Sequence, residues 1–354
     1  MKILSSTLKQ IEPQDSQSRA AAHSRLEQLA IPYWALGRLM DLAEDLAGMT
    51  RSLRPPVSRR TIVTMAGDHG VVAEGVSKYP QEVTTQMVQN FVDGGAGINV
   101  LARQAGAQVV VVDMGVAGDL SALAQSGKIL SRRVGPGTRN MAIGPAMSRE
   151  EAVQSIESGI AISKDLGDRT DIFATGDMGI GNTTPSSAII AAITGCTAAS
   201  ATGRGTGIDD SQLQHKISVI ERSLNVNHPD PADAIDILAK VGGFEIGGIA
   251  GLILGAASMK KPVLIDGLIS TAGALIASCL EPRSIEYMIA AHRSVEQGHR
   301  IALQRLRKEP LLDLNLRLGE GTGGALAMYL VEAAVRVLTE VASFEEADVS
   351  REDK

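Results

Sequence analysis

Short, continuous apolar runs alternate with helical stretches through the middle of the chain. Each run ends at a glycine or a polar residue, as in residues 61–65, which are followed by Gly67, Asp68 and His69. Runs that are apolar throughout are typical of strands buried on both faces of a parallel sheet. The alternation predicts βαβ units, with strands in 61–65, 109–112, 171–175, 262–265 and 287–291 and helices in 81–104, 148–166 and 246–257.

Both ends of the chain carry a helical pattern instead. Leucines at helical spacing occupy residues 17–49, and a break at Pro32 predicts two helices there. Prolines between arginines and serines predict a linker at 51–60. Residues 294–341 are again helical, with a glycine-rich break at 318–324. We therefore expect an α/β fold with a Rossmann-like parallel sheet and helices on both of its faces, built as a large domain of residues 59–293 and a small helical domain of residues 1–58 and 294–354.

Composition narrows the class of protein. Hydrophobic residues make up 44% and charged residues 21% of the 354 residues, which indicates a globular chain. The net charge of −6 and only nine aromatic residues argue against nucleic-acid binding, which relies on basic surfaces and aromatic platforms. Cys196 and Cys279 lie among small residues, and we expect them in the core of a protein in a reducing compartment rather than in a disulfide or a zinc site.

The sequence shows neither a signal peptide nor a membrane-spanning segment. The first twenty residues lack the apolar segment of a signal peptide. The longest apolar stretch, residues 246–259, is shorter than the ~20 residues that a membrane span needs. We expect a cytoplasmic protein that binds neither membranes nor nucleic acids.

Candidate chemistry gathers at the predicted strand ends, where ligands bind in open parallel sheets. Any one acid in such a position is more often a turn or helix-capping residue than a ligand-binding one. Several acids at one edge, flanked by glycines, favour a ligand site. The polar residues at these strand ends are Asp68, His69, Asp113, Asp177, Asp266 and His292.

Two glycine strings could cradle a phosphate. Residues 176–185 place three glycines before Asn182, Thr183 and a proline at a predicted helix start, which would leave backbone N–H groups free for an anion. Their spacing differs from the dinucleotide motif, so the string indicates a phosphate or sugar site. Residues 203–210 precede a helix with Lys216 and are either a second cradle or a flexible linker, since the P-loop spacing is absent.

Glu320 lies between two glycines in an otherwise apolar segment. It is either a surface turn residue or a buried acid whose pKa is raised by desolvation and which acts as a general base. Arg317, three residues earlier, is close enough to bind an anion. The residues alone leave both interpretations open.

Seven strings together resemble one family, the nicotinate-nucleotide:dimethylbenzimidazole phosphoribosyltransferases, which activate the lower-ligand base of cobamides. They occur in the family's order over about residues 30–330, and jointly they are highly specific although no single string is. The matching strings are 66–76 (AGDHGVVAEGV), 79–84 (YPQEVT), 94–102 (GGAGINVLA), 176–187 (GDMGIGNTTPSS), 241–248 (VGGFEIGG), 263–267 (VLIDG) and 317–323 (RLGEGTG).

The resemblance implies a fold and a reaction. The family has a large Rossmann-like domain and a small helical domain from both chain ends, and it works as a dimer, which here would be a homodimer or a heterodimer with a paralogous subunit. Nicotinate mononucleotide would lose nicotinate while an aromatic base attacks C1′, giving an α-ribotide. The base would be 5,6-dimethylbenzimidazole, adenine or a phenol. Because nicotinate leaves with its ring charge neutralised, no metal or cofactor is expected.

The resemblance also implies roles for individual residues. Glu320 would be the general base, and Asp177 a second acid that faces the ribose or the attacking base. The aromatic base would lie against Glu82, Tyr79, Met178 and Leu318. Ribose and phosphate would be held by Gly176, Gly179, Gly181, Asn182, Thr183, Gly203, Gly205, Lys216 and Arg317, with Ser294 near the nicotinate end.

Two departures from the family pattern keep an alternative open. The family usually carries glutamate at the position of Asp177, and residues 31–40 keep only part of an early family string. The alternative is a weakly active or non-catalytic paralogue that pairs with an active chain. An NAD-linked Rossmann enzyme is disfavoured, because no dinucleotide glycine motif follows the first predicted strand.

Overall fold

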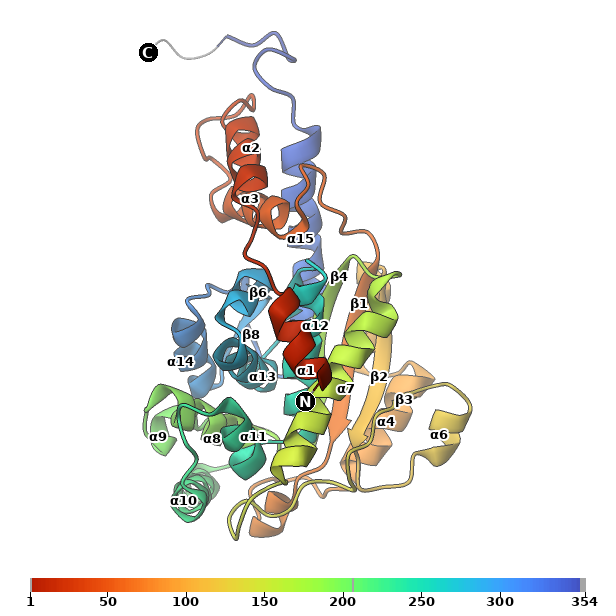
Figure 1. Ribbon diagram of the computed structural model, residues 1–354, viewed down its shortest axis with the longest axis vertical. Coiled ribbons are helices and arrows are strands. Elements are labelled where there is room, and N and C mark those ends of the chain that lie inside the picture. Colours follow the sequence, from red (N-terminus) through yellow and green to blue (C-terminus); the bar gives the residue numbers. More distant parts are fainter. Residues whose placement is uncertain (1, 206, 351–354) are drawn as a thin grey trace.

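A six-stranded parallel sheet forms the centre of the molecule (Figure 1). The computed structural model describes residues 2–205 and 207–350; Thr206 of the second glycine string, Met1 and residues 351–354 of the expected helical domain lie outside the described residues. The strand order is β3-β2-β1-β4-β5-β6. The strands are β1 (Arg60–Gly67), β2 (Ala107–Gly115), β3 (Leu130–Ser131), β4 (Ile172–Met178), β5 (Val263–Ile265) and β6 (Met288–Ala290).

All five strands predicted from apolar runs are present, and their order places the candidate chemistry. β1 pairs in parallel with β2 on one side and with β4 on the other. The chain therefore builds outward from β1 in one direction and from β4 in the other, and the crevice for a ligand opens between their carboxyl ends. Asp68 follows β1 and Asp177 lies at the end of β4, so both reach this edge of the sheet.

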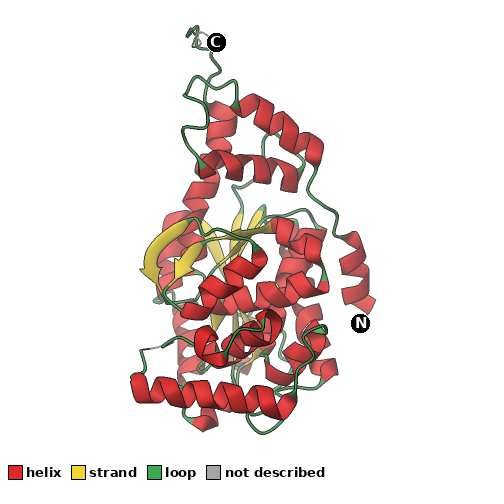
Figure 2. Cartoon of the chain, turned by 90° about the vertical axis from the view of Figure 1, so that its left-hand side faces the viewer, coloured by secondary structure: helices red, strands yellow, loops and turns green. Residues whose placement is uncertain are grey.

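Helices cover both faces of the sheet, as the sequence predicts (Figures 1 and 2). α12 contacts β1, β2 and β4 and is covered by α7, whereas α15 contacts β4 and β5 beside α5. The predicted helical stretch 81–104 is two helices, separated at Gly94 and Gly95. The helices are α1 (Lys2–Gln10), α2 (Ser16–Leu26), α3 (Arg38–Thr50), α4 (Val83–Asp93), α5 (Gly97–Ala105), α6 (Ser121–Gln125), α7 (Arg149–Gly167), α8 (Thr183–Thr194), α9 (Ala198–Ala201), α10 (Asp210–Asn227), α11 (Ala234–Val241), α12 (Phe244–Ser258), α13 (Leu268–Leu280), α14 (Gln297–Leu306) and α15 (Thr322–Glu340), with short 3-10 helices η1 (Gly70–Glu74) and η2 (Pro282–Tyr287).

Glycines bring α7 and α12 into backbone contact. A Cβ on Gly251 would lie 1.9 Å from the carbonyl oxygen of Ile156, and one on Gly159 would lie 2.0 Å from that of Gly248. Larger side chains here would push the helices apart, because Cβ atoms do not approach other atoms this closely. Part of the high glycine content therefore serves helix packing rather than ligand access.

The chain ends form helices at the predicted places. α2, α3 and α15 pack together at the top of the view in Figure 1, and residues 31–40 lie in the connection between α2 and α3 and at the start of α3. α1 instead packs on α7 and α12, and α14 packs on α13 and α8. β8 (Leu312–Leu316) lies inside the stretch 294–341 that was predicted to be helical, and it pairs in parallel with β7 (His292–Ser294) at the beginning of that stretch. The division into two domains stays a prediction.

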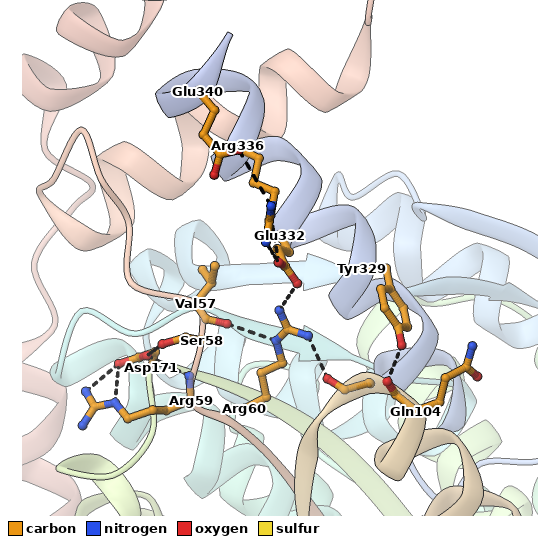
Figure 3. Close-up of polar contacts among 11 residues, drawn as sticks. Val57, Ser58, Arg59, Arg60, Gln104, Asp171, Tyr329, Glu332, Arg336 and Glu340 are labelled. Atoms are coloured by element: carbon orange, nitrogen blue, oxygen red, sulfur yellow. Dashed lines mark hydrogen bonds and ion pairs between the residues drawn. The ribbon is translucent and has the colours of Figure 1, made fainter.

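A polar network fastens the 51–60 linker to the sheet and to α15 (Figure 3). Arg60 donates hydrogen bonds to the carbonyl oxygens of Val57 (3.1 Å) and Ala105 (2.7 Å) and forms an ion pair with Glu332 of α15. Arg59 donates to the carboxylate of Asp171 just before β4 at 2.9 Å. Because α15 also packs on α3, this network fixes the terminal helices relative to the sheet.

The structure bears on two expectations from the sequence: that no segment is long and apolar enough to span a membrane, and that both cysteines lie in the core. α15 is long and apolar enough to span a membrane, but half of its apolar window is buried and it packs on α3, α5 and β4, as a core helix does. The expectation that both cysteines lie in the core is wrong. Cys279 is exposed and Cys196 is half-buried, and both are free thiols, because they lie near helix ends rather than inside the α7 and α12 layer.

Candidate active site

A cavity of about 390 Å³ opens at the carboxyl ends of the strands. A smaller pocket shares Asn182 and Thr183 with it, and a third shares Arg317. Of the residues predicted for the site, the cavity is lined by Tyr79, Asp177, Met178, Gly179, Asn182, Thr183, Gly205, Ser294, Arg317, Leu318 and Glu320; the smaller pocket adds Gly181 and Lys216, and the third adds Gly203.

Two predicted residues do not line these walls. Glu82 is exposed just before α4, and its assignment to the aromatic base stays a prediction. Gly176 lies within β4, beneath the backbone of Glu320. A Cβ at this position would lie 2.3 Å from the carbonyl oxygen of Glu320, so Gly176 supports the site from behind.

Glu320 is held in a backbone conformation that few residues other than glycine adopt. Its φ is +63°, between Gly319 at +82° and Gly321 at +99°. The hydroxyl of Thr64 at the centre of β1 donates to the Glu320 carbonyl at 2.9 Å. Such strained residues persist only where their surroundings fix them, and they concentrate at functional sites. The strand ends thus hold the Glu320 carboxylate against the cavity.

The Glu320 carboxyl is the buried acid that the sequence left as one of two possibilities. It is 5% exposed, and its Oε2 accepts the Ile98 N–H at the start of α5 at 3.0 Å. Burial raises its pKa, while the Ile98 hydrogen bond opposes the rise. A carboxylate with a raised pKa takes up protons more readily near neutral pH, which suits a general base.

Asp177 lies beside Glu320 on the floor of the cavity. Its Oδ2 accepts a hydrogen bond from the Asn182 side-chain amide at 3.1 Å, and its Oδ1 is buried without a partner among the described residues. Burial, reinforced by the charges of Asp266 and Glu245, raises the pKa of Asp177 well above its ordinary value. A neutral Asp177 can donate a hydrogen bond from Oδ1 to a ligand oxygen.

The other acids at the strand ends hold loops, so the capping interpretation is correct for them. Asp68 accepts the Ala117 N–H at 2.8 Å, and Asp113 accepts the Val116 N–H at 2.9 Å. Asp266 accepts the N–H groups of Gly321 and Gly324 and so fixes the first turn of α15, directly after Glu320. Of the strand-end acids, Asp177 is the one that lines the cavity.

One wall of the cavity is apolar. Tyr79, Val83 and Met87 follow one another at intervals of four residues into α4, and Met178 and Leu318 add further apolar side chains to the lining. Tyr79 is 51% and Leu318 59% exposed, so an apolar ring that enters here would cover them. Val83 and Met87 were not predicted, although their spacing from Tyr79 is visible in the sequence.

A second part of the site is cationic. Lys216 is buried, and its ammonium donates to the Thr183 hydroxyl at the start of α8 at 2.6 Å. Burial lowers the pKa of Lys216 to about 8, and the Glu296 carboxylate opposes this shift. Arg317 donates to the Gly205 carbonyl at 3.4 Å. The start of α8 and these two cations form a site suited to an anion.

Several cavity residues were not assigned to the site from the sequence. His292 follows a strand end and could have been included on that ground. Gly319 is one of the two glycines that flank Glu320, but it was not itself assigned to the site. Glu296 carries no local signal, because only the fold brings it to the cavity. Beyond these and the two α4 residues, the additional lining residues are Ile180, Gly267, Leu268 and Ile269.

Comparison with known proteins assigns the chain to a family. The sequence profile of a family described as phosphoribosyltransferase matches residues 11–349. The chain belongs to this phosphoribosyltransferase family. The nicotinate-nucleotide–dimethylbenzimidazole phosphoribosyltransferase of Syntrophotalea carbinolica is 64% identical over 351 residues, 99% of each chain, and that of Desulfotalea psychrophila is 57% identical over 100% of each. The crystal structure of CobT from Thermus thermophilus is similar, with a TM-score of 0.91, 44% identity and coverage of 95% of this chain and 100% of that one.

Membership confirms the resemblance, the fold class and the enzyme class predicted from the sequence. The protein is a phosphoribosyltransferase, an enzyme that transfers a pentosyl group. The two relatives and this chain match over 99–100% of their lengths.

Proposed function

We propose that this phosphoribosyltransferase moves the 5-phosphoribosyl group from nicotinate mononucleotide to 5,6-dimethylbenzimidazole or a related aromatic base, giving an α-ribotide and nicotinate for cobamide assembly. The names of relatives that match the whole chain support these substrates. The observation that carries the proposal is the position of Glu320, a buried carboxyl at a cavity with an apolar wall and a cationic end.

Glu320 takes the proton from the incoming base. As one ring nitrogen bonds to C1′, the bond from C1′ to the nicotinate nitrogen breaks and its electrons neutralise the pyridinium. The attacking ring gains a positive charge, which it loses when its other nitrogen gives its proton to Glu320. General-base assistance of this kind contributes about 10²–10⁴-fold.

Asp177 orients the ribose. Its neutral carboxyl donates from Oδ1 to a ribose hydroxyl, while Asn182 holds Oδ2. This side chain has one methylene fewer than the glutamate that is usual in the family, so it leaves more room between the cavity floor and the ligand. Lys216, Thr183, Arg317 and the N–H groups at the start of α8 bind the 5′-phosphate, and Tyr79 and its apolar neighbours cover the aromatic base.

A panel of bases tests the function. The purified chain alone is incubated with nicotinate mononucleotide and with dimethylbenzimidazole, adenine or phenol, and free nicotinate is measured. We expect release with at least one base and a strong preference within the panel. No release with any base contradicts the proposal. Release that requires a second, paralogous chain supports the non-catalytic paralogue instead.

We further infer that the enzyme works as a dimer in the cytoplasm. The mass from light scattering of the purified chain, at 37.1 kDa per subunit, tests the assembly. A single-subunit mass at assay concentration would contradict it. Fractionation of cells, with the enzyme recovered in the cytosolic fraction, tests the location.

A further inference from the structure

Glu296 is a buried acid beside the phosphate end of the site. It is 7% exposed, directly before α14, and its backbone N–H donates to the Ser294 hydroxyl at 3.3 Å. Its side chain does not cap α14, and its Oε2 is buried without a hydrogen-bond partner among the described residues. A buried carboxylate in this state is costly unless nearby cations compensate its charge.

The glycine loop is built around this carboxylate. A Cβ on Gly203 would lie 1.9 Å from Glu296 Oε2, so any larger residue there would displace the carboxylate. The backbone N–H of Gly205 hydrogen-bonds Glu296. A Cβ on the same Gly205 would lie 3.5 Å from the Lys216 ammonium. Gly205 therefore contacts the acid on one side and the buried lysine on the other.

The charged groups around Lys216 are few. α8 and α9 pack on α10 and carry no acidic or basic side chain, and Asp236 and Lys240 of α11 pair with each other at 2.8 Å. Arg204 lines the smaller pocket together with Lys216 and forms an ion pair with Asp210 of α10. The His215 ring forms a hydrogen bond with the Glu74 carbonyl at 2.6 Å. Glu296 is thus the acid whose charge acts on Lys216.

The positive charges of Lys216 and Arg317 act on the Glu296 carboxyl. β7 contributes His292 and Arg293, of which Arg293 pairs with Asp313 at 3.1 Å. Within α14, burial lowers the pKa of His299 to about 3, so it is neutral. Burial raises the pKa of Glu296, and Lys216, the Gly205 N–H and Arg317 oppose the rise.

We propose that Glu296 is a positioning residue of the phosphate site, whose carboxylate keeps Lys216 protonated and holds the 203–205 backbone against it. The inference rests on the proposed function, since it takes Lys216 as a ligand of the substrate phosphate. Glu296 does not touch the reacting atoms. It acts through Lys216, so its removal changes the pH dependence of nucleotide capture rather than the chemical step.

The sign of the effect follows from the charges. With Glu296 ionised, Lys216 loses its proton near pH 8, and capture of the phosphate weakens above that pH. Without the Glu296 carboxylate, nothing opposes the lowering of the Lys216 pKa by burial, so Lys216 loses its proton at a lower pH. Below that range Lys216 is charged in both proteins. There the variant binds phosphate as well as the wild type or better, because a negative charge has been removed.

The test is the pH profile of kcat/KM for nicotinate mononucleotide with Glu296→Gln, since this ratio reports ionisations of the free enzyme. We expect the alkaline fall to move down by about one pH unit, which lowers kcat/KM about tenfold on the alkaline side, with kcat unchanged. Gly203→Ala, which displaces the same carboxylate, is expected to shift the profile in the same direction. Gly144→Ala, whose added Cβ meets nothing within 4 Å, is the matched control.

Lys216→Arg shows whether the effect passes through the lysine. Its guanidinium stays charged over this range, so the alkaline fall is expected to disappear, and adding Glu296→Gln is expected not to restore it. Unchanged profiles in both Glu296→Gln and Gly203→Ala would overturn the inference. Calorimetry of nucleotide binding separates this failure from failure of the proposed function, in which the wild type would bind no nicotinate mononucleotide.

Discussion

Replacing Gly176 with alanine tests how the sheet positions the general base. The added Cβ would lie 2.3 Å from the Glu320 carbonyl oxygen and 2.6 Å from its carbonyl carbon, whereas ordinary contact begins near 3.4 Å. The Glu320 backbone must therefore move by about 1.1 Å, the difference between the contact distance and 2.3 Å. A displacement of ~1 Å at a reacting group can lower the rate about 10²-fold. Overpacking of a buried position costs about 1–3 kcal/mol of unfolding free energy.

The assay measures kcat and KM for nicotinate release together with the melting temperature. We expect kcat to fall about 10²-fold, with a smaller change in KM for the nucleotide, because Lys216 of the phosphate end lies on α10, away from the displaced segment. Gly144→Ala is the matched control and is expected to keep full activity, since its Cβ has open space. A folded Gly176→Ala enzyme with unchanged kcat would refute the reasoning.

Three further variants separate chemistry from stability. Glu320→Gln is expected to lower kcat at least ~10²-fold and to abolish the acidic limb of the pH profile. In the wild type this limb lies above the ordinary glutamate range, because burial raises the pKa of Glu320. A variant with the wild-type kcat would show that Glu320 is not the general base. Asp177→Asn is expected to stabilise the fold by about 0.5–2 kcal/mol at pH 7 while lowering activity. The folded state keeps the Asp177 proton to higher pH than the unfolded state. The wild type therefore loses stability as pH rises from the ordinary aspartate pKa through the raised pKa of Asp177. The difference in melting temperature between the variant and the wild type should vanish near pH 3. Arg60→Met is expected to cost about 1–3 kcal/mol in urea unfolding, because it leaves the Val57 and Ala105 carbonyls without their donor, and to leave KM unchanged.

Five of the six strands could be predicted, because they are largely buried and form continuous apolar runs. The two-residue β3 is half-buried to exposed and was not predicted. β1 and β4 were found this way, and the rule that ligands bind at carboxyl ends of parallel strands led to Asp177. β8 could not be predicted in the same way. It is a largely exposed strand with polar residues, LDLNL, and it forms only because β7 lies beside it in the fold.

The site was predicted where chemistry and sequence position coincide, and missed where only the fold brings residues together. Glycines beside Glu320 and before Lys216 were readable as access for a ligand. The contact of Gly176 with the Glu320 backbone, and that of Gly203 with Glu296, join segments far apart in the chain, so no local pattern reveals them. The glycines in the sequence therefore indicated where the ligand site lies, but not which residues each glycine contacts in the fold.

The most direct test of the transfer reaction is its product balance. Nicotinate mononucleotide and dimethylbenzimidazole are incubated with enzyme in excess over nucleotide, and nicotinate, ribotide and ribose 5-phosphate are measured together, with the anomeric configuration of the ribotide determined by NMR. We expect one α-ribotide for each nicotinate, and no products when the base is omitted. Nicotinate formed with ribose 5-phosphate in place of a ribotide would contradict transfer to a base.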